Sequence, residues 1–507
     1  MKRLLITWVA VLLFMGATVT PAVALTNGGH DTVGATSPST TWYFAEGYTG
    51  EKFDEWLCLQ NPGSATANVT ITYMFRDGEN QTTSKSIPAN SRETISVNSD
   101  AGANKEVSIK VEADRQIVAE RSMYFNYQNK WPGGHNTVGT TATSNTWYFA
   151  EGYTGSGFEE WLTLQNPGAT DATVTITYMF REGETLVRTK TVAANSRETV
   201  DVNTDAGADK EVSIKVESTQ PLVAERPVYF DYQSMDPSNT FNSSGGHNTM
   251  GATSTSNSWY FAEGYTDALF DNWLTLQNPG AADATVTITY YFRGSGTQTN
   301  SKTVAANSRE TIYVNQDVGT GKEVSIEIQS TQPLVAERPI YFAIEEFSDG
   351  GHNTLGVTAA QTSWYFAEGY TGDGFREWLT LQNPNATSAN ATITYMYRNG
   401  DTKTIGKNIP ANSRETIDVN TDIGTNQEVS LKVESDNAII AERPMYFCYQ
   451  GSWDQTSPTN PTVFVTDTGT KYHNDGCRHL KASKHAISLS EAKSQGYSPC
   501  STCNPPQ

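Results

Sequence analysis

Four residues near the C-terminus have the types and the spacing of a metal site. His473 and Cys477 stand four positions apart, and Cys500 and Cys503 follow as a C-x-x-C pair. Imidazole and thiolate are ligands that Zn²⁺ prefers, and two close pairs on separate turns can supply its tetrahedron. The segment 463–507 is too short to bury much core, so it would gain from such a cross-link. The spacing predicts one structural zinc ion.

A disulfide is the alternative use of these thiols. Secreted proteins form disulfides, and Cys477 could pair with Cys500. This pairing would leave one thiol over and give His473 no role, so we favour zinc. His479 and His485 are alternative fourth ligands for the metal.

Short elements must position these ligands. Residues 463–467 and 471–473 are expected to form a hairpin that turns at Thr468-Gly469. Ser488 and Glu491 form a capping box that opens a short helix, and Gly496 would close it. We therefore expect a small α+β zinc-binding module at 463–507, joined to the rest by an extended linker at 451–462.

This module resembles the zinc-binding domain of the adaptive-response DNA methyl-phosphotriester repair proteins. The likeness rests on the ligand spacing and on Glu491-Ala492, Gly496-Tyr497, Pro499 and Pro505 around the C-x-x-C pair. In that family the first ligand is a cysteine that accepts the methyl group, and here this position is His473. An imidazole on zinc is no substitute for a nucleophilic thiolate, so the resemblance implies a structural or docking module without repair activity.

Most of the remaining chain is one segment repeated four times. The motif WYFAEGYT begins at Trp42, Trp147, Trp259 and Trp364, at spacings of 105, 112 and 105 residues. A period this long indicates tandem whole domains. The copies are expected at 28–128, 133–233, 245–345 and 350–450. They resemble the WYFAEG-type tandem repeats of secreted and surface bacterial proteins, which implies an extracellular, sandwich-like module but no particular ligand.

Each copy is expected to be a β-sandwich. In the first, residues near 41–46, 56–60, 67–76, 81–88, 92–98, 105–112 and 117–126 are rich in β-branched and aromatic side chains. About seven short strands in about 100 residues are typical of an immunoglobulin-like β-sandwich. We expect an all-β protein with four tandem sandwiches. Connectors at 129–132, 234–244 and 346–349 predict a semi-rigid, monomeric rod with a looser joint in the middle.

The aromatic residues of the repeat have two alternative roles. We favour the sandwich core, because buried tryptophan is a regular feature of such sandwiches. The alternative is an exposed platform that stacks on sugar rings. The candidate ligand-binding residues are Trp42, Tyr48, Phe53, Trp147, Tyr153, Phe158, Trp259, Tyr265, Phe270, Trp364, Tyr370 and Phe375.

Charged residues also recur at fixed places. Glu46, Arg92-Glu93 and Glu120-Arg121 have counterparts in every copy. Paired carboxylates could indicate glycosidase chemistry, but a structural ion-pair network within each sandwich is the interpretation we favour. One histidine per copy follows Gly-Gly at the joints and is expected to be a hydrogen-bonded turn residue; these are His30, His135, His247 and His352.

The N-terminus predicts secretion. Lys2 and Arg3 precede an apolar run, and Ala22-Val23-Ala24 is a small-x-small cleavage site, so residues 1–24 would be a signal peptide. No transmembrane segment is expected in the mature chain. The net charge of −20 argues against nucleic acid as a partner. Cys58 and Cys448 have no counterparts in the other copies, which excludes a recurring disulfide.

These features favour a secreted or cell-surface binding and spacer protein that is not an enzyme. Repetition raises avidity for a repeated ligand, so adhesion, or binding to a cell-envelope component or polysaccharide, is the leading hypothesis. One alternative is a carbohydrate-binding array that uses the aromatic loop of each repeat. A second is a non-catalytic accessory to an extracellular hydrolase.

Overall fold

The computed structural model describes residues 26–235, 240–294, 296–344, 347–453, 462–474, 477–481, 483–494, 496–503 and 505. The expected signal peptide, the mature start at Leu25 and most of the linker lie outside these residues. Residues 25–453 form one compact unit and the C-terminal segment belongs to another, and each is described by itself.

The first repeat is a sandwich of two four-stranded antiparallel sheets. Its elements are β2 (Ser39–Phe44), β3 (Phe53–Asn61), β4 (Ala67–Phe75), β5 (Asn80–Ile87), β6 (Ser91–Ser96), α1 (Val97–Ala101) and β7 (Val107–Tyr127). One sheet has the order β5-β4-β7-β2, and the other has β6-β3-β7 with a strand of the next copy beside β7. The long strand β7 therefore crosses from one sheet to the other, where two separate strands were expected.

The other copies repeat this order. The second contains β9 (Ser144–Phe149), β10 (Phe158–Asn166), β11 (Ala172–Phe180), β12 (Thr185–Val192), β13 (Ser196–Asp201), α2 (Val202–Ala206) and β14 (Val212–Gln233). The third contains β16 (Ser256–Phe261), β17 (Tyr265–Thr266), β18 (Phe270–Asn278), β19 (Ala284–Phe292), β20 (Thr297–Val304), β21 (Ser308–Tyr313), α3 (Val314–Val318) and β22 (Lys322–Ile344). The fourth contains β24 (Gln361–Phe366), β25 (Phe375–Asn383), β26 (Ala389–Tyr397), β27 (Thr402–Ile409), β28 (Ser413–Asp418), α4 (Val419–Ile423) and β29 (Val429–Tyr449).

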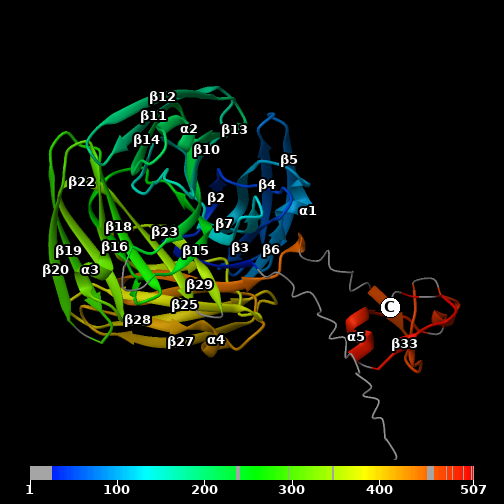
Figure 1. The fold of residues 1–507 in the computed structure, drawn as a ribbon. Coiled ribbons are helices and arrows are strands. Elements are labelled where there is room, and N and C mark those ends of the chain that lie inside the picture. The colour runs from blue at the N-terminus through cyan, green and yellow to red at the C-terminus, as the bar shows by residue number, and fades with distance from the viewer. Residues whose placement is uncertain are drawn as a thin grey trace, which may run out of the picture. The chain divides into compact units, whose positions relative to one another are not determined.

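Four further strands, which carry the Gly-Gly-His motif, close the repeats into a ring. They are β1 (Thr26–Val33), β8 (Trp131–Val138), β15 (Asn242–Met250) and β23 (Ser348–Leu355). Strands β8, β15 and β23 each pair with the long strand of the copy before them. Strand β1 completes the fourth copy by pairing with β29, so the two ends of the repeat array meet (Figure 1). The expectation of a rod is therefore wrong: the repeats form a closed ring.

Glycines let these four strands approach one another in the middle of the ring. A Cβ atom on Gly28, Gly133, Gly245 or Gly350 would lie 3.3, 3.2, 3.6 and 3.3 Å from the Cα of the next glycine in the circle. The Gly-Gly-His motif therefore lies in a strand and not in a turn at a joint. Glycine is required there because only a residue without a side chain fits between two backbones.

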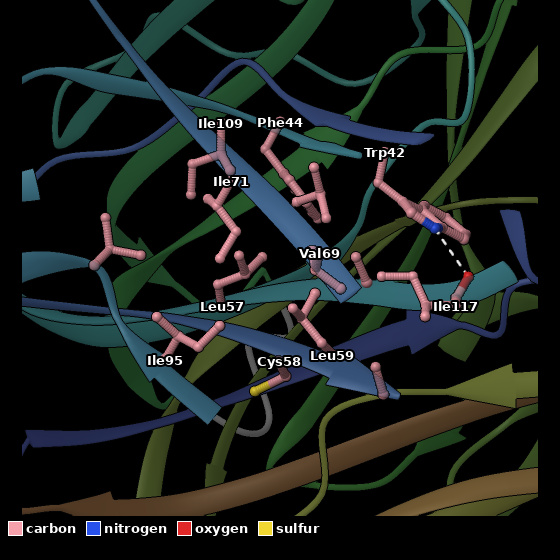
Figure 2. Close-up of a cluster of buried hydrophobic side chains, with 14 of the residues drawn as sticks. Trp42, Phe44, Leu57, Cys58, Leu59, Val69, Ile71, Ile95, Ile109 and Ile117 are labelled. Atoms are coloured by element: carbon pink, nitrogen blue, oxygen red, sulfur yellow. Dashed lines mark hydrogen bonds between the residues drawn. The ribbon is translucent and has the colours of Figure 1, made fainter. Parts of the chain in front are cut away.

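Each sandwich has its own hydrophobic core. In β4, Val69, Ile71 and Tyr73 are buried while Thr70 is exposed, which is the alternation that a half-buried strand requires. Figure 2 shows the first core, in which the Nε1 of Trp42 donates a hydrogen bond to the carbonyl of Ile117 at 3.0 Å. The interior is therefore assembled from both sheets of one repeat.

The C-terminal unit is a small α+β module. It contains β30 (Thr462–Val465), β31 (Lys471–Tyr472), the 3₁₀-helix η2 (Arg478–Leu480), β32 (His485–Ser488), α5 (Leu489–Ser494) and β33 (Ser498–Pro499). Of the expected hairpin between 463–467 and 471–473, the structure contains a single β-bridge, between Phe464 and His473. Strand β30 instead pairs along its length with β32. In the part of the chain that the structure describes, no helix is long and apolar enough to cross a membrane.

Candidate metal centre and seam pockets

The four predicted metal ligands converge in the C-terminal module. His473 follows β31, Cys477 precedes η2, and Cys500 and Cys503 follow β33. One ligand atom from each residue lies within 4.8 Å of all the others. The Nδ1 of His473 lies 3.3 Å from the Sγ of Cys477 and 3.9 Å from the Sγ of Cys503. These separations suit the edges of a tetrahedron around one metal ion, so the donor set fits the site.

Backbone amides donate hydrogen bonds to two of the candidate thiol ligands. The amide of Asn474 donates to the Sγ of Cys503 at 3.3 Å, and the amide of Thr502 donates to the Sγ of Cys500 at 3.4 Å. Burial works against ionisation of Cys500, but hydrogen bonds from Thr502 and Cys503 outweigh it and lower its pKa to about 7, whereas burial raises the pKa of Cys503 to about 11. A thiol that ionises readily is a better metal ligand.

The alternative ligands lie elsewhere. The Nε2 of His479 is 3.2 Å from the Oγ1 of Thr502, and the Nε2 of His485 is 2.5 Å from the Oδ1 of Asp467. The structure brings neither into the four-ligand group. The five cysteines are all free thiols.

The second candidate region is the contact between neighbouring repeats, which we call a seam. Each seam is defined by one fully buried arginine that pairs with a glutamate of the next copy. The pairs are Arg121–Glu225 at 3.1 Å in seam 1, Arg226–Glu337 at 2.9 Å in seam 2, Arg338–Glu442 at 2.8 Å in seam 3 and Arg443–Glu120 at 3.1 Å in seam 4. The buried ion pairs therefore run between copies and around the ring, in addition to pairs within one copy as expected, such as Arg443–Glu368 at 2.8 Å.

Other buried carboxyl groups accompany these arginines, and one of them holds the same place in three seams. In seam 2 it is Glu160, whose Oε1 lies 4.0 Å from the Nε of Arg226. Glu55 and Glu377 hold the same position beside Arg121 and Arg443, and all three are fully buried. Burial raises the pKa of each of the three to about 8. Each of these seams thus holds one carboxyl that binds a proton at neutral pH.

Seam 3 has as many buried carboxyl groups as the other seams, but one of them stands at a different position. Asn272 stands where the other copies have glutamate. Asp31 of β1 stands where the others have Asn136, Asn248 or Asn353, and its Oδ2 lies 2.5 Å from the Nη2 of Arg338. Here burial raises the pKa of Glu442 to about 8, and Asp31 adds to the effect. The carboxyl lost at one position reappears at another beside the same guanidinium.

Pockets open at three seams. Their volumes are about 240 Å³ at seam 1, 390 Å³ at seam 3 and 310 Å³ at seam 4. Each is lined by a tyrosine and a phenylalanine of one copy, a tryptophan of the other, and an arginine with a glutamate. These are Tyr48, Phe53, Trp161, Arg197 and Glu106 at seam 1; Tyr265, Phe270, Trp378, Arg414 and Glu323 at seam 3; and Tyr370, Phe375, Trp56, Arg92 and Glu428 at seam 4.

The candidate aromatic residues divide between core and seam. Trp42, Trp147, Trp259 and Trp364 are at most 2 % exposed and belong to the sandwich cores. The tyrosines and phenylalanines of the set lie at the seams. There each tyrosine packs edge-on against its phenylalanine, with ring centroids 4.9–5.0 Å apart. The half-buried second tryptophan of each motif, at 56, 161, 273 and 378, was not among the predicted site residues. Its recurrence in the WL-x-LQNP segment of every copy is the sequence feature that could have identified it as a site residue.

The four histidines near the ring centre are also not in turns. His30, His135, His247 and His352 lie in strands and are 1–3 % exposed. Neither ring nitrogen of any of them has a hydrogen-bond partner among the described residues. Burial lowers the pKa of all four, and nearby arginines add to this. They are neutral imidazoles at neutral pH.

Comparisons with known proteins cover single repeats or coarse outlines. A family of unknown function, DUF5719, matches residues 132–226. No curated protein matches the chain. Thermotoga maritima 1070 is 20% identical over 22% of this chain and 94% of its own (TM-score 0.18), and the Anabaena sensory rhodopsin transducer is 26% identical over 17% and 95% (TM-score 0.16). A tetra-tandem repeat from the extending region of a large adhesion protein is 10% identical over 81% and 100% (TM-score 0.11). At such TM-scores these likenesses carry no argument about function.

Proposed function

We propose that this chain is a secreted or cell-surface binding protein whose closed ring presents ligand pockets at its seams, with a zinc-stapled module at the C-terminal end. The observation that carries the proposal is the recurrence of one pocket type at three seams. A ring held by buried ion pairs would fix the distances between these pockets. A repeated ligand would then be held at several points, which multiplies weak affinities.

Carbohydrate is the ligand class that the pocket lining favours. Tyr48, Phe53 and Trp161 offer aromatic faces at seam 1, and Glu106 lies beside them. Aromatic faces pack against sugar rings, and carboxylates accept hydrogen bonds from hydroxyl groups. The volumes of the two larger pockets lie in the range of small-ligand sites, about 300–1,000 Å³. A cell-envelope or extracellular polysaccharide would present such rings repeatedly.

Binding, not catalysis, is the role proposed for the seam acids. Arg197 pairs with Glu46 at 3.4 Å and with Glu106 at 3.3 Å. Arg92 pairs in the same way with Glu428 at 3.3 Å. An acid held as an ion pair is poorly placed to donate or accept a proton in a reaction.

The test is binding of the mature chain to a panel of neutral and acidic oligosaccharides and to isolated peptidoglycan. The variant Trp56→Ala/Trp161→Ala/Trp378→Ala removes the aromatic wall from three pockets and should abolish binding. The matched control is Trp273→Ala in seam 2, where the indole Nε1 donates a hydrogen bond to the hydroxyl of Tyr232 at 3.1 Å. Binding that survives the triple substitution, with the fold verified by circular dichroism, would refute the seam sites.

Zinc is the metal proposed for the four-ligand site. Three thiolates and one imidazole at tetrahedral separations are a typical structural zinc set. Purified mature chain should contain one zinc per molecule, and His473→Ala should weaken zinc binding at least tenfold in competition with a chelator. His485→Ala is the control and should leave binding unchanged. A disulfide between Cys477 and Cys500, found together with an absence of metal, would refute this proposal.

A further inference from the structure

Seam 3 differs from the other seams at the mouth of its pocket. In seams 1, 2 and 4 the last tyrosine of the long strand lies beside an acid of the next copy, an arrangement we call the latch. The latches are Tyr127 with Glu159, Tyr232 with Asp271 and Tyr449 with Asp54, and the last two pairs are hydrogen-bonded at 2.6 and 2.8 Å. Each latch tyrosine also stacks on the tyrosine beneath it, with ring centroids 4.1, 3.9 and 4.0 Å apart.

Both members of the latch are replaced in seam 3. Ile344 stands in place of the tyrosine and Arg376 in place of the acid. Both residues line the pocket, and so does Tyr446, the tyrosine that a latch would cover. This pocket, at about 390 Å³, is larger than those of seam 1 (about 240 Å³) and seam 4 (about 310 Å³).

Arg376 also reverses the charge of the pocket. The linings of seams 1 and 4 each contain one arginine and two glutamates. The lining of seam 3 contains three arginines and two glutamates. Arg414 and Arg293 are paired with Glu323 at 3.6 and 2.9 Å. Glu345 and Glu346 lie outside the described residues and do not enter this count.

The guanidinium of Arg376 is available to a ligand. The side chain is exposed and stacks over the ring of Phe347 at 3.9 Å, and it forms no ion pair with any residue that the structure describes. A stacked guanidinium keeps its hydrogen-bond donors at its edge, where a carboxylate can accept two of them. Tyr265 and Trp378, both half-buried, line the same pocket and supply aromatic faces.

We propose that the seam 3 pocket binds an acidic sugar, with its carboxylate on Arg376 and its ring against the aromatic wall. The inference rests on the proposed function, because it names the ligand of one seam pocket. Three features define the chemistry: the lost latch, the surplus positive charge and the adjoining aromatic faces. The other two pockets, with a surplus of negative charge, would take neutral sugars.

Calorimetry with the mature chain tests this, using tri-galacturonic acid and its methyl ester, in which each carboxylate is replaced by an uncharged methyl ester. The acid should bind at one site per chain and at least tenfold more tightly than the ester. Arg376→Gln should abolish that preference. Arg188→Gln, which removes an exposed arginine of β12 that lines none of the three seam pockets, should not. The latch-restoring variant Ile344→Tyr/Arg376→Asp should fold normally and lose acid binding.

The outcomes separate this inference from the proposed function. Equal binding of acid and ester, or an acid preference that survives Arg376→Gln, would overturn the inference and leave the seam pockets as sugar sites. Inorganic phosphate that binds as tightly as the sugar acid would overturn the saccharide class. Failure of both sugars, together with failure of the whole oligosaccharide panel, would overturn both proposals.

Discussion

At seam 3 the carboxyl stands at position 31 and the amide at position 272, the reverse of the other seams, and this exchange predicts how substitutions there change the stability of the ring. Asp31→Asn removes a buried carboxylate 2.5 Å from Arg338 but leaves Glu442 at 2.8 Å. Loss of one partner of a buried pair costs about 3–5 kcal/mol. Because Glu442 remains and an amide is the native group at the three equivalent positions, we expect about 2 kcal/mol.

The reverse single change should also destabilise the ring. Asn272→Glu adds a further carboxyl beside Arg338, and it must take up a proton in order to be buried. For a carboxyl of ordinary pKa this costs about 3 kcal/mol at pH 7. The double variant Asp31→Asn/Asn272→Glu recreates the arrangement of the other three seams. Its stability should therefore lie within about 1 kcal/mol of the native chain, the additivity error of such measurements included.

Urea unfolding followed by tryptophan fluorescence measures all four proteins. The expected coupling between the two positions is at least 2 kcal/mol and favours the double variant. A matched control is the pair Asn136→Asp and Glu377→Asn at seam 4, which should show the same rescue. If the double variant is as unstable as the two single changes added together, the idea that each buried arginine needs the same number of buried carboxyl groups is wrong.

Other perturbations test the core, the ring centre and the buried charges. Trp42→Ala should cost about 3–5 kcal/mol in urea unfolding, because it empties a core position and frees the carbonyl of Ile117; a smaller loss than about 1 kcal/mol would contradict a core role. Gly133→Ala should cost about 1–3 kcal/mol, because its Cβ would lie 3.2 Å from the Cα of Gly245, whereas Gly406→Ala, with nothing within 4 Å, should be neutral. Four buried carboxyls with pKa raised from 4.5 to about 8 hold protons that the unfolded chain releases, so the free energy of unfolding should fall as pH rises from about 6.5 to 8. The four histidines, whose pKa is lowered from 6.5, take up protons on unfolding and oppose the carboxyls below about pH 6.5, so the profile should level off there. A free energy of unfolding that does not change between pH 6.5 and 8 would contradict the carboxyl assignment.

The sandwich could be predicted because its signals are local. Val69, Ile71 and Tyr73 alternate with threonines, and this pattern alone fixes a half-buried strand. The continuity of β7 was missed because residues 114–116 are polar and look like a loop. They are polar because the strand is exposed where it passes from one sheet to the other.

The ring could not be predicted from the repeat itself. Glycine-rich sequence is typical of turns, and nothing local shows that Gly28 and Gly133 meet at a centre. The partner of Arg121 was equally hidden, since Glu120 and Glu225 occupy the same position of the repeat and only the fold selects between them. The metal ligands were found because their chemistry is carried by spacing within a short segment. The seam pockets were not, because each is built from two copies.

The most direct test of the closed ring uses the native thiol of Cys448. Asn27 of β1 lies directly opposite Cys448 of β29. Two cysteines at directly opposed positions of an antiparallel pair lie within disulfide range. The variant Asn27→Cys should therefore form an intramolecular 27–448 disulfide on mild oxidation, found by mass spectrometry in monomeric protein, while Ser37→Cys, an exposed position nearby, should not link to Cys448. Free thiols at 27 and 448 after oxidation, or a disulfide found only between molecules, would contradict the ring.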